Sequence, residues 1–487
     1  MFVRYATLFA GFVLVFAGGS IAAADWDQWR GERRDGVDHD SPALIDSLPD
    51  DGLKPVWISR EELSGAKSGG WSSPIVADGR LYLYTHTKTK VANDELPPKK
   101  FPWLPPEKRT GMSDADYEQY EINRRNEDEQ RSKNYRFDEV IYCLDASSGK
   151  LLWEKSVSSF YTRFPQSGTP AVANGRLYIL GAGRVARCLD AGTGKEIWKQ
   201  RLPGEFRDEF LQSSFVVTEG MAVVSCDHLF GLDAATGEIV WEGDPQKTRA
   251  EHSSPTVWKT GNSSHVIANV AGETACFEPK RGRELWRIDS AAGNATPLVV
   301  GDTLLTYGSS RKSGLRAYRL STDGAEHLWT FNKVADPGSS PVVVGDYVYV
   351  QGERRLACVN LEDGSSEWME NLDVDRPRYT SLIAGDGKVI YAFDSILAFA
   401  ADPADCRELM KGRIDKTGLL AEESIFRGRL NMNELEKTAE GQKEAERLWR
   451  NTFNGAGPLN CATPVLANGR LYVRLEDGVA CYDLRAK

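Results

Sequence analysis

The chain has 487 residues, a formal net charge of −10 and an apolar fraction of 41%, and this length suffices for one large core or for two or three ordinary domains. Lys and Arg number 60 against 70 Asp and Glu, and they form no long basic stripe. Nucleic acid is therefore not an expected partner, because neutralising phosphates requires clustered cations.

The first 24 residues have the three parts of a secretory signal peptide. Arg4 provides a positive charge, residues 6–17 form an apolar run, and three alanines end at Ala24. We expect cleavage after Ala24 and a periplasmic or secreted mature protein. The apolar run is short for a membrane span and no second run follows, so no transmembrane span is expected after cleavage.

Residues 25–53 form an N-terminal leader that begins DWDQWRGERRDGV, and two short motifs recur after it. One motif reads D-A-x-x-G-x-x-x-W, as in DASSGKLLW at residues 145–153. Its tryptophans are separated by 39 to 45 residues over most of the chain. Aligning the motif selects eight tryptophans: Trp57, Trp153, Trp198, Trp241, Trp286, Trp329, Trp368 and Trp449.

The second motif also occurs eight times and reads as an apolar run, a tight turn and an alternating run, as in SSPIVADGRLYLY at residues 72–84. It predicts two antiparallel strands joined by a hairpin, with a third strand after it and a fourth around the tryptophan. A period of about 40–45 residues with strand content is typical of propeller blades. We predict an all-β fold: an eight-bladed β-propeller of four-stranded antiparallel blades over residues 54–487.

The ends of the repeat predict how the propeller closes. Trp57 precedes the first hairpin, whereas the last copy ends in ACYDLRAK with no tryptophan after it. We therefore expect the N-terminal strand to complete the last blade, which removes exposed sheet edges.

Two insertions interrupt the repeat, and both are expected to be partly helical. The first, at about residues 87–138, lies between the second and third strands of its blade and contains a capping pattern at Ser113. The second, at about residues 402–446, is placed between the third and fourth strands. Long loops in a compact domain are often functional, and we expect the first insertion to contact a partner or to cover the mouth of the channel.

Five of the eight cysteines recur at one position of the third strand. Equivalent positions on neighbouring blades are too far apart for a disulfide, so we interpret these cysteines as small buried apolar residues. The sequence pairs none of the three others, which are Cys226, Cys406 and Cys461.

The combination L-D-A-x-T-G-K-x-x-W with T-P-V-V-x-x-G-R-L-Y-V resembles the PQQ-like repeat proteins over nearly all of residues 54–487. This superfamily includes the quinoprotein alcohol dehydrogenases and the BamB outer-membrane assembly factor, and the chain is most similar to the BamB-like branch of exported bacterial proteins. The resemblance implies a propeller; in the dehydrogenases it also implies pyrroloquinoline quinone (PQQ) over Ca²⁺, held by an adjacent cysteine pair, carboxylates and an asparagine.

The motifs for such cofactors are not seen in this sequence. No two cysteines are adjacent, no acidic cluster has the spacing of a calcium loop, and no C-x-x-C-H is present. No cofactor and no metal site are therefore expected, although PQQ and calcium stay possible through the resemblance, and no catalytic residue is assigned.

The loops that lead into the first strands are expected to converge on one mouth of the central channel, where donors and aromatic rings could hold a small anionic or sugar-like ligand. The candidate ligand-binding residues are Trp71, Arg163, Gln212, His252, Asn294, Arg378, Tyr379 and Asn460.

Taken together, the sequence favours an exported, monomeric, non-catalytic protein that binds an envelope protein or acts as a scaffold in cell-envelope assembly. Two alternatives stay open. One is a PQQ-dependent oxidoreductase with an atypical site, and the other is a protein that binds or processes carbohydrate at the channel mouth.

Overall fold

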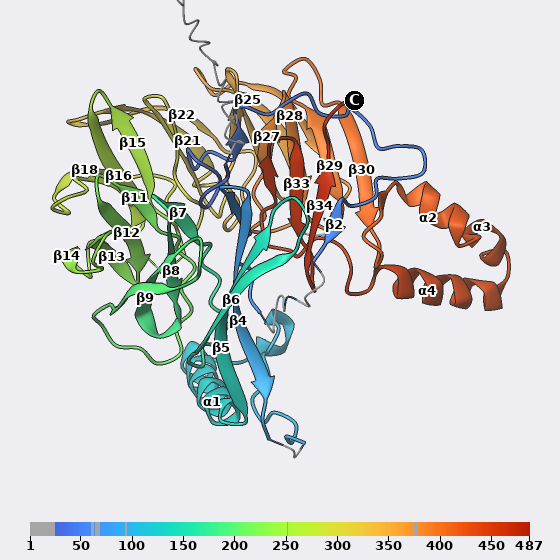
Figure 1. The fold of residues 1–487 in the computed structure, drawn as a ribbon, viewed down its shortest axis with the longest axis horizontal. Coiled ribbons are helices and arrows are strands. Elements are labelled where there is room, and N and C mark those ends of the chain that lie inside the picture. Colours follow the sequence, from blue (N-terminus) through green and yellow to red (C-terminus); the bar gives the residue numbers. More distant parts are fainter. Residues whose placement is uncertain (1–24, 60–62, 64–68, 93–94, 251, 375–376) are drawn as a thin grey trace, which may run out of the picture.

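The computed structural model describes residues 25–59, 63, 69–92, 95–250, 252–374 and 377–487. The expected signal peptide lies outside these residues. Eight antiparallel sheets follow one another along the chain, and the first strands of neighbouring sheets contact each other around the centre (Figure 1). The predicted eight-bladed propeller of four-stranded blades is confirmed.

We number the blades by their order in the chain, and each runs outward from its first, innermost strand. Blade 1 comprises β3 (Ile75–Ala77), β4 (Arg80–Lys90), β5 (Tyr135–Asp145) and β6 (Leu151–Ser158), and blade 2 comprises β7 (Ala171–Ala173), β8 (Arg176–Gly181), β9 (Val185–Asp190) and β10 (Glu196–Arg201). Blade 3 comprises β11 (Val216–Thr218), β12 (Met221–Cys226), β13 (His228–Asp233) and β14 (Ile239–Glu242). Blade 4 comprises β15 (Thr256–Thr260), β16 (Ser263–Val270), β17 (Glu273–Phe277) and β18 (Glu284–Ile288).

The last four blades have the same order, and the eighth takes its outer strand from the N-terminal part of the chain. Blade 5 comprises β19 (Leu298–Val300), β20 (Thr303–Tyr307), β21 (Leu315–Ser321) and β22 (Gly324–Phe331), and blade 6 comprises β23 (Val342–Val344), β24 (Tyr347–Gly352), β25 (Arg355–Asn360) and β26 (Ser366–Asn371). Blade 7 comprises β27 (Ile383–Gly385), β28 (Lys388–Ala392), β29 (Ile396–Ala400) and β30 (Glu408–Ile414). Blade 8 comprises β32 (Val465–Ala467), β33 (Arg470–Arg474), β34 (Val479–Asp483) and β2 (Trp57–Ile58).

The outer strand of blade 8 confirms the predicted closure. Trp57 of β2 pairs with Cys481 of β34 in an antiparallel register. The propeller therefore closes by main-chain hydrogen bonds between two segments at opposite ends of the described chain.

The repeated tryptophan and glycine form one joint between neighbouring blades. Trp153 of blade 1 donates its indole N–H to the carbonyl of Ala191 in blade 2, at 3.2 Å. Its ring covers Gly194, which has φ of +71° and where a Cβ would lie 2.6 Å from the ring. Glycine is thus required twice, for its conformation and for the close approach of the ring. The same indole bond to the next blade is made by Trp57, Trp198, Trp241, Trp286, Trp329 and Trp368.

The repeated cysteine lies opposite the tryptophan of its own blade. Cys143 pairs with Trp153, and Cys188 with Trp198. All eight cysteines are free, and six of them are buried. The interpretation of the repeated cysteines as small core residues agrees with this placement.

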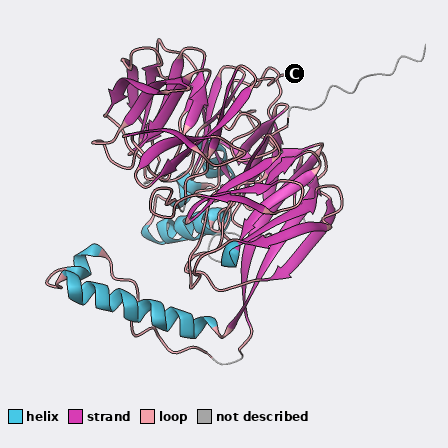
Figure 2. Ribbon diagram, turned by 90° about the vertical axis from the view of Figure 1, so that its left-hand side faces the viewer, coloured by secondary structure: helices cyan, strands magenta, loops and turns pink. Residues whose placement is uncertain are grey.

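The first insertion extends the β4–β5 hairpin beyond the ring. It carries η1 (Pro106–Arg109) and α1 (Asp114–Ser132), and the predicted cap forms because Ser113 Oγ accepts the N–H of Asp116 at 3.2 Å. Figure 2 shows α1 standing away from the strands. Salt bridges from Arg125 and Arg207 connect α1 with the loop before blade 3.

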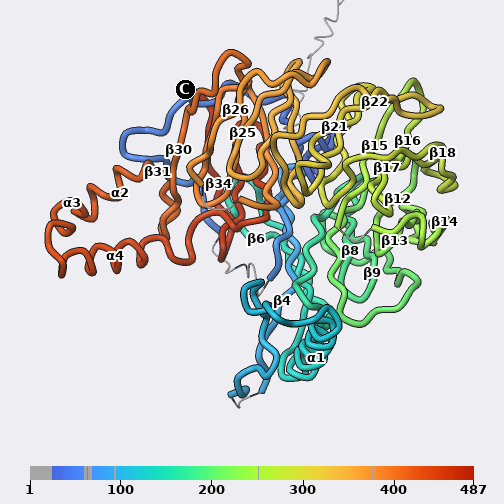
Figure 3. Tube along the Cα trace, turned by 180° about the vertical axis from the view of Figure 1, so that it is seen from behind, coloured from blue at the N-terminus to red at the C-terminus, as the bar shows by residue number. Residues whose placement is uncertain are grey.

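The second insertion lies at a different place from the one predicted. Strand β30 follows β29 after a short loop, so the insertion follows the fourth strand of blade 7. It begins with β31 (Leu420–Ala421), which pairs with β30, and continues through α2 (Glu423–Arg429), α3 (Met432–Leu435) and α4 (Ala439–Phe453). These helices project from the edge of the propeller (Figures 1 and 3).

The assignment of Trp449 to a fourth strand is therefore wrong. Trp449 lies on α4, where its ring packs against Phe453 with 4.6 Å between centroids. In blade 7 the position of the repeated tryptophan is taken by Met410, which pairs with Ala398. The tryptophan pattern does not identify this strand, because blade 7 has another apolar residue in place of the tryptophan. Among the described residues, no helix is both long and apolar enough to cross a membrane.

Candidate functional site: a cup over a plugged channel

The leader fills the centre of the propeller from the side where the first strands end. Its short strand β1 (Val37–Asp38) pairs in parallel with β27. Trp26 forms a bridge with Val76 of blade 1, and the carbonyl of Asp27 accepts the N–H of Val172 of blade 2 at 2.7 Å. The leader is therefore part of the propeller core and closes one end of the channel.

Two buried arginines bind the leader to first strands on different sides of the ring. Arg30 donates to the carbonyls of Pro341 and Leu382 in blades 6 and 7. Arg34 donates to the carbonyl of Phe215 in blade 3 at 2.7 Å. Burial lowers the pKa of Arg30 to about 10 and that of Arg34 to about 9, so both remain charged at neutral pH. Each guanidinium therefore donates charge-assisted hydrogen bonds to main-chain carbonyls that have no partner in a neighbouring strand.

A ring of hydroxyl groups surrounds the channel above the leader. In seven of the eight copies of the second motif, the Ser or Thr hydroxyl at the second position accepts the main-chain N–H of its counterpart in the preceding blade, at 2.9–3.3 Å. The eighth hydroxyl, that of Thr296, accepts the indole N–H of Trp29. The repeated S-S-P and T-P sequences are thus explained, since each hydroxyl satisfies a buried donor. The ring residues are Ser73, Thr169, Ser214, Ser254, Thr296, Ser340, Ser381 and Thr463.

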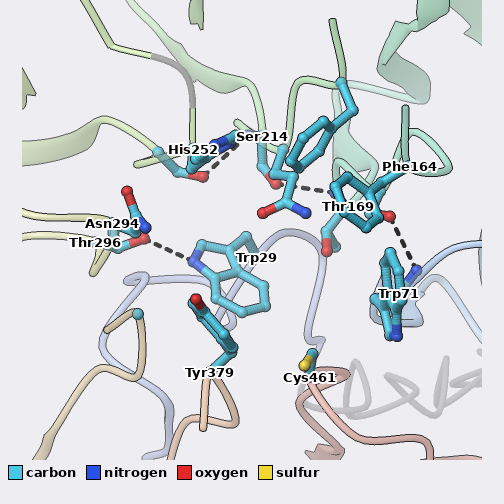
Figure 4. Close-up of a pocket in the computed structure, with 15 residues that line it drawn as sticks. Trp29, Trp71, Phe164, Thr169, Ser214, His252, Asn294, Thr296, Tyr379 and Cys461 are labelled. Carbon is cyan, nitrogen blue, oxygen red and sulfur yellow. Dashed lines mark hydrogen bonds between the residues drawn. The ribbon is translucent and has the colours of Figure 1, made fainter. Parts of the chain in front are cut away.

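A cavity of about 430 Å³ opens above this ring, and we call it the cup (Figure 4). Each of the eight loops that lead into a first strand contributes at least one residue to the lining of the cup. These loops therefore converge on one mouth of the channel, as expected from the sequence. The lining residues are Trp29, Trp71, Phe164, Ser167, Thr169, Phe210, Gln212, Ser214, His252, Ser254, Asn294, Thr296, Gly338, Tyr379 and Cys461.

The cup has an aromatic floor and an aromatic wall. The floor is Trp29 of the leader, whose indole N–H donates to Thr296 Oγ1 at 2.8 Å. On the wall, Phe164 meets Phe210 edge to face at 4.9 Å, and Phe210 stacks on His252 at 5.0 Å. Trp71 continues this arc beside Phe164. The polar groups are hydroxyls and amides, such as Asn294 and Gln212.

Asp336 positions the opposite side of the cup. Its buried Oδ1 accepts the main-chain N–H groups of Gly338, Ser339 and Tyr379, at 2.7–3.2 Å. Burial raises the pKa of this carboxyl despite these three bonds. Tyr379 is thereby held at φ of +63°, and this residue, which lines the cavity, is 41% exposed. No sequence pattern indicates Asp336, because it belongs to no repeated motif.

The structure divides the eight candidate residues predicted from the sequence. Trp71, Gln212, His252, Asn294 and Tyr379 line the cup. The remaining three do not: Arg163 lines a neighbouring pocket, and Arg378 and Asn460 are exposed residues of the same loops.

Sequence reasoning missed the floor of the cup and part of its wall. Trp29 belongs to the leader, whose place in the channel no periodicity indicates. Phe164 and Phe210 stand in the correct loops, and their apolar character on exposed connections was the available signal. Cys461 also lines the cup, and burial raises the pKa of its thiol to about 11. Little thiolate exists at neutral pH, which is the opposite of what a nucleophilic cysteine requires.

The residues of the cup do not fit PQQ over calcium. Among its described lining residues there is no Asp, Glu, Lys or Arg, whereas Ca²⁺ prefers carboxylate oxygens and the carboxylates of the quinone require cations. Within the described parts of the chain, no group of three or more His, Cys, Asp and Glu side chains is placed to hold a metal ion.

Comparisons with known proteins agree with the fold. Residues 137–368 match the family model described as "Outer membrane protein assembly factor BamB". The tetrathionate hydrolase of Acidithiobacillus ferrooxidans is 26% identical over 249 residues, which cover 46% of this chain and 48% of that protein. The chain thus matches about half the length of this curated relative.

Two solved dehydrogenases have the same architecture. The quinohemoprotein alcohol dehydrogenase of Comamonas testosteroni superposes with a TM-score of 0.55 at 12% identity, covering 95% of this chain and 81% of the other. A europium-containing methanol dehydrogenase gives 0.53 at 11% identity, covering 93% and 90%. At such identities the likeness shows the fold alone. With the repeated motifs and the family match over residues 137–368, it makes this chain similar to the PQQ-like repeat propellers.

Proposed function

We propose that this propeller is a non-catalytic binding module of the cell envelope and that the cup is its ligand site. One observation supports the proposal most: a cavity closed at its base by the leader, walled by aromatic rings and lined by no described Asp, Glu, Lys or Arg. Small-molecule sites have this composition, with many aromatic groups and a few polar ones that set orientation.

The composition of the cup favours an uncharged ligand with flat apolar faces and hydroxyl edges, which is the chemistry of a sugar ring. Trp29 and the arc from Trp71 to His252 offer ring faces for stacking. Asn294 and Gln212 offer donors and acceptors for hydroxyl groups. An anionic ligand would meet no described cation in the lining, so the anionic alternative is less well supported for this cavity.

A glycan array with the purified protein tests this proposal, followed by calorimetry with any sugar that binds. Trp71→Ala and Tyr379→Ala should each weaken binding by roughly fivefold or more, because the comparable stacking of a base on an aromatic side chain is worth about 1–3 kcal/mol. Trp103→Ala is the matched control, since Trp103 is 60% exposed on the first insertion and outside the cup. Equal losses in all three variants, or no binding by the array, would contradict the proposal.

A titration with PQQ, with and without Ca²⁺, separates the binding module from an oxidoreductase. We expect no saturable heat at micromolar protein, because the cup lacks the charged groups that the quinone and the ion require. Calcium-dependent binding of one quinone per chain would overturn the proposal.

A protein partner is a second candidate, favoured by the first insertion. Helix α1 contains no buried residue although it is 19 residues long, and Trp103 beside it is largely exposed. The family model, which matches residues 137–368, carries the description of an assembly factor, and this supports a protein-binding role for the propeller as a whole. Pull-down from envelope extract with and without residues 91–134 tests it; identical partners would contradict a role for the insertion.

A further inference from the structure

A second pocket of about 220 Å³ lies on the other side of the loop that carries Phe164 into the cup. It is enclosed by the β4–β5 hairpin, α1 and residues 161–165. Its lining residues are His86, Lys88, Lys99, Asp128, Arg131, Ser132, Tyr135, Phe137, Tyr161, Thr162, Arg163 and Pro165. The insertion therefore builds a cavity of its own that is separate from the cup.

This pocket is strongly cationic. Lys88, Lys99, Arg131 and Arg163 line it, and the carboxylate in the described lining is that of Asp128. Asp128 is already engaged, because it accepts a hydrogen bond from Lys99. The positive charge of the remaining three side chains is thus not balanced within the pocket.

The contacts of these three cations leave them able to bind a further anion. Lys88 lies with Nζ 4.0 Å from the centroid of Tyr135 and has no carboxylate partner among the described residues. Partial burial, followed by repulsion from Lys99, lowers its pKa. Arg131 uses Nη1 for the carbonyl of Pro97, and the same atom lies 4.0 Å from a carboxylate oxygen of Glu127, which is too far for a hydrogen bond. Arg163 has Nε 3.7 Å from a carboxylate oxygen of Asp208, a separation too long for a hydrogen bond.

Asp208 is shared, which weakens its hold on Arg163. Arg125 of α1 donates to both oxygens of this carboxylate. The guanidinium of Arg163 therefore keeps most of its donors free for another acceptor.

One titratable side chain of the lining, His86, is neutral. His86 is 2% exposed, and its Nδ1 accepts the main-chain N–H of Gln166 at 3.0 Å. Because a main-chain N–H can only donate, the ring proton is on Nε2. Burial lowers the pKa of His86 to about 4, although the Phe160 carbonyl acts in the other direction. Nε2 is sealed from solvent, and the Phe160 carbonyl acts on this ring. His86 is therefore a neutral part of the pocket wall.

We propose that this pocket binds a small oxyanion of charge −2, of the sulfate or phosphate class, between Lys88, Arg131 and Arg163. Arginine forks suit two oxygens of such an ion, and lysine adds a point charge. The site is independent of the sugar proposed for the cup, because the two cavities share no lining residue.

Calorimetry with sodium sulfate, against sodium chloride at equal ionic strength, tests the site in the full protein. We expect one sulfate per chain. Lys88→Gln and Arg131→Gln should each weaken binding by roughly tenfold, since hydrogen bonds to charged groups are among the strong ones. Arg319→Gln is the matched control, because Arg319 is a 67% exposed residue of blade 5, and it should bind sulfate as the unchanged chain does.

Phosphate and tetrathionate in parallel titrations distinguish the members of this class. Any of the three ions that saturates and is weakened by Lys88→Gln and Arg131→Gln supports the site. Absence of saturable binding by all three, or equal affinity in the variants and the unchanged chain, overturns it. Melting curves identify a misfolded variant, and Lys88, near the end of the long hairpin, can then be tested alone. If the protein binds sulfate but no sugar, only the proposal of a sugar site in the cup is contradicted.

Discussion

The indole N–H of Trp29 and the hydroxyl of Thr296 form a 2.8 Å hydrogen bond across 267 residues of sequence. This bond fixes the leader beneath the cup, so the floor of the candidate site and the plug of the channel are the same structural unit. Changes in the leader should therefore affect the site as well as the stability of the propeller.

Trp29→Phe and Trp29→Ala separate the two contributions of this side chain. The phenylalanine keeps a ring at the floor and loses the hydrogen bond, which should reduce the free energy of unfolding by about 1 kcal/mol. The alanine also removes the ring, so it should cost more stability and abolish binding of a cup ligand. Denaturant unfolding and ligand titration check both; equal effects of the two variants would contradict the role of the ring.

Arg34→Met should destabilise the propeller strongly. It removes the donor to the buried Phe215 carbonyl, and a buried acceptor without a partner costs about 1–3 kcal/mol. Arg33→Met is the control, because the neighbouring Arg33 is exposed. Denaturant unfolding should show a lower midpoint for Arg34→Met alone. A similar shift in both variants would mean that the change in net charge is responsible, and not the loss of the hydrogen bond to the Phe215 carbonyl.

Gly237→Ala tests the joint between blades 2 and 3. Gly237 has φ of +77°, and a Cβ there would lie 2.5 Å from the ring of Trp198. Gly175→Ala is a matched control, with φ of +71° and nothing within 4 Å of the added atom. Both variants carry the conformational strain, but overpacking should add about 1–3 kcal/mol only at Gly237. Thermal unfolding of the pair measures the difference, and equal melting temperatures would exclude the packing argument.

Asp27 should make stability depend on pH between about 4 and 6. Burial, followed by repulsion from Asp25 and Glu32, raises the pKa of its carboxyl to about 6. The folded state then binds the proton more tightly than the unfolded state, so stability falls as pH rises through this window. A rise of about two pKa units corresponds to about 3 kcal/mol.

Asp27→Asn should remove this loss. The variant and the unchanged chain should unfold alike near pH 4, and the variant should be the more stable one at pH 7. Asp40→Asn serves as the control, since Asp40 is an exposed residue of the same segment. Unfolding curves at several pH values check the effect, and parallel pH profiles would refute it.

Thiol titration checks the state of the cysteines. All eight are free and six are buried, and burial raises the pKa of Cys406 and Cys461 to about 11. We expect slow reaction of at most two thiols in the native protein with a disulfide reagent. Eight should react after denaturation without reductant, and a lower number would reveal disulfides that this fold does not accommodate.

The repeat made the ring predictable, and the segments without a repeat were not. Trp57 can be assigned to the last blade because it precedes the first hairpin, whereas the last hairpin has no tryptophan after it. The pairing of β2 with β34 confirms this assignment. Blade 7 was misread since Met410 replaces the tryptophan there. The leader binds residues far away in sequence, such as Leu382 for Arg30, and no local pattern indicates contacts of that range. The cup was therefore found in part, through loops that the repeat places, and its floor was missed.

The pairing of β2 with β34 also determines when the molecule can be completed during synthesis. Trp57 leaves the ribosome long before Cys481, and at about 5–20 residues per second the delay is tens of seconds. Throughout this time the nascent chain has open strand edges. Arg30 of the leader also lacks its final acceptors until blades 6 and 7 have been made. Blade-by-blade folding can start early, but the last step is a long-range closure. A chain stalled before blade 8 would remain an open arc that is prone to pair with other copies.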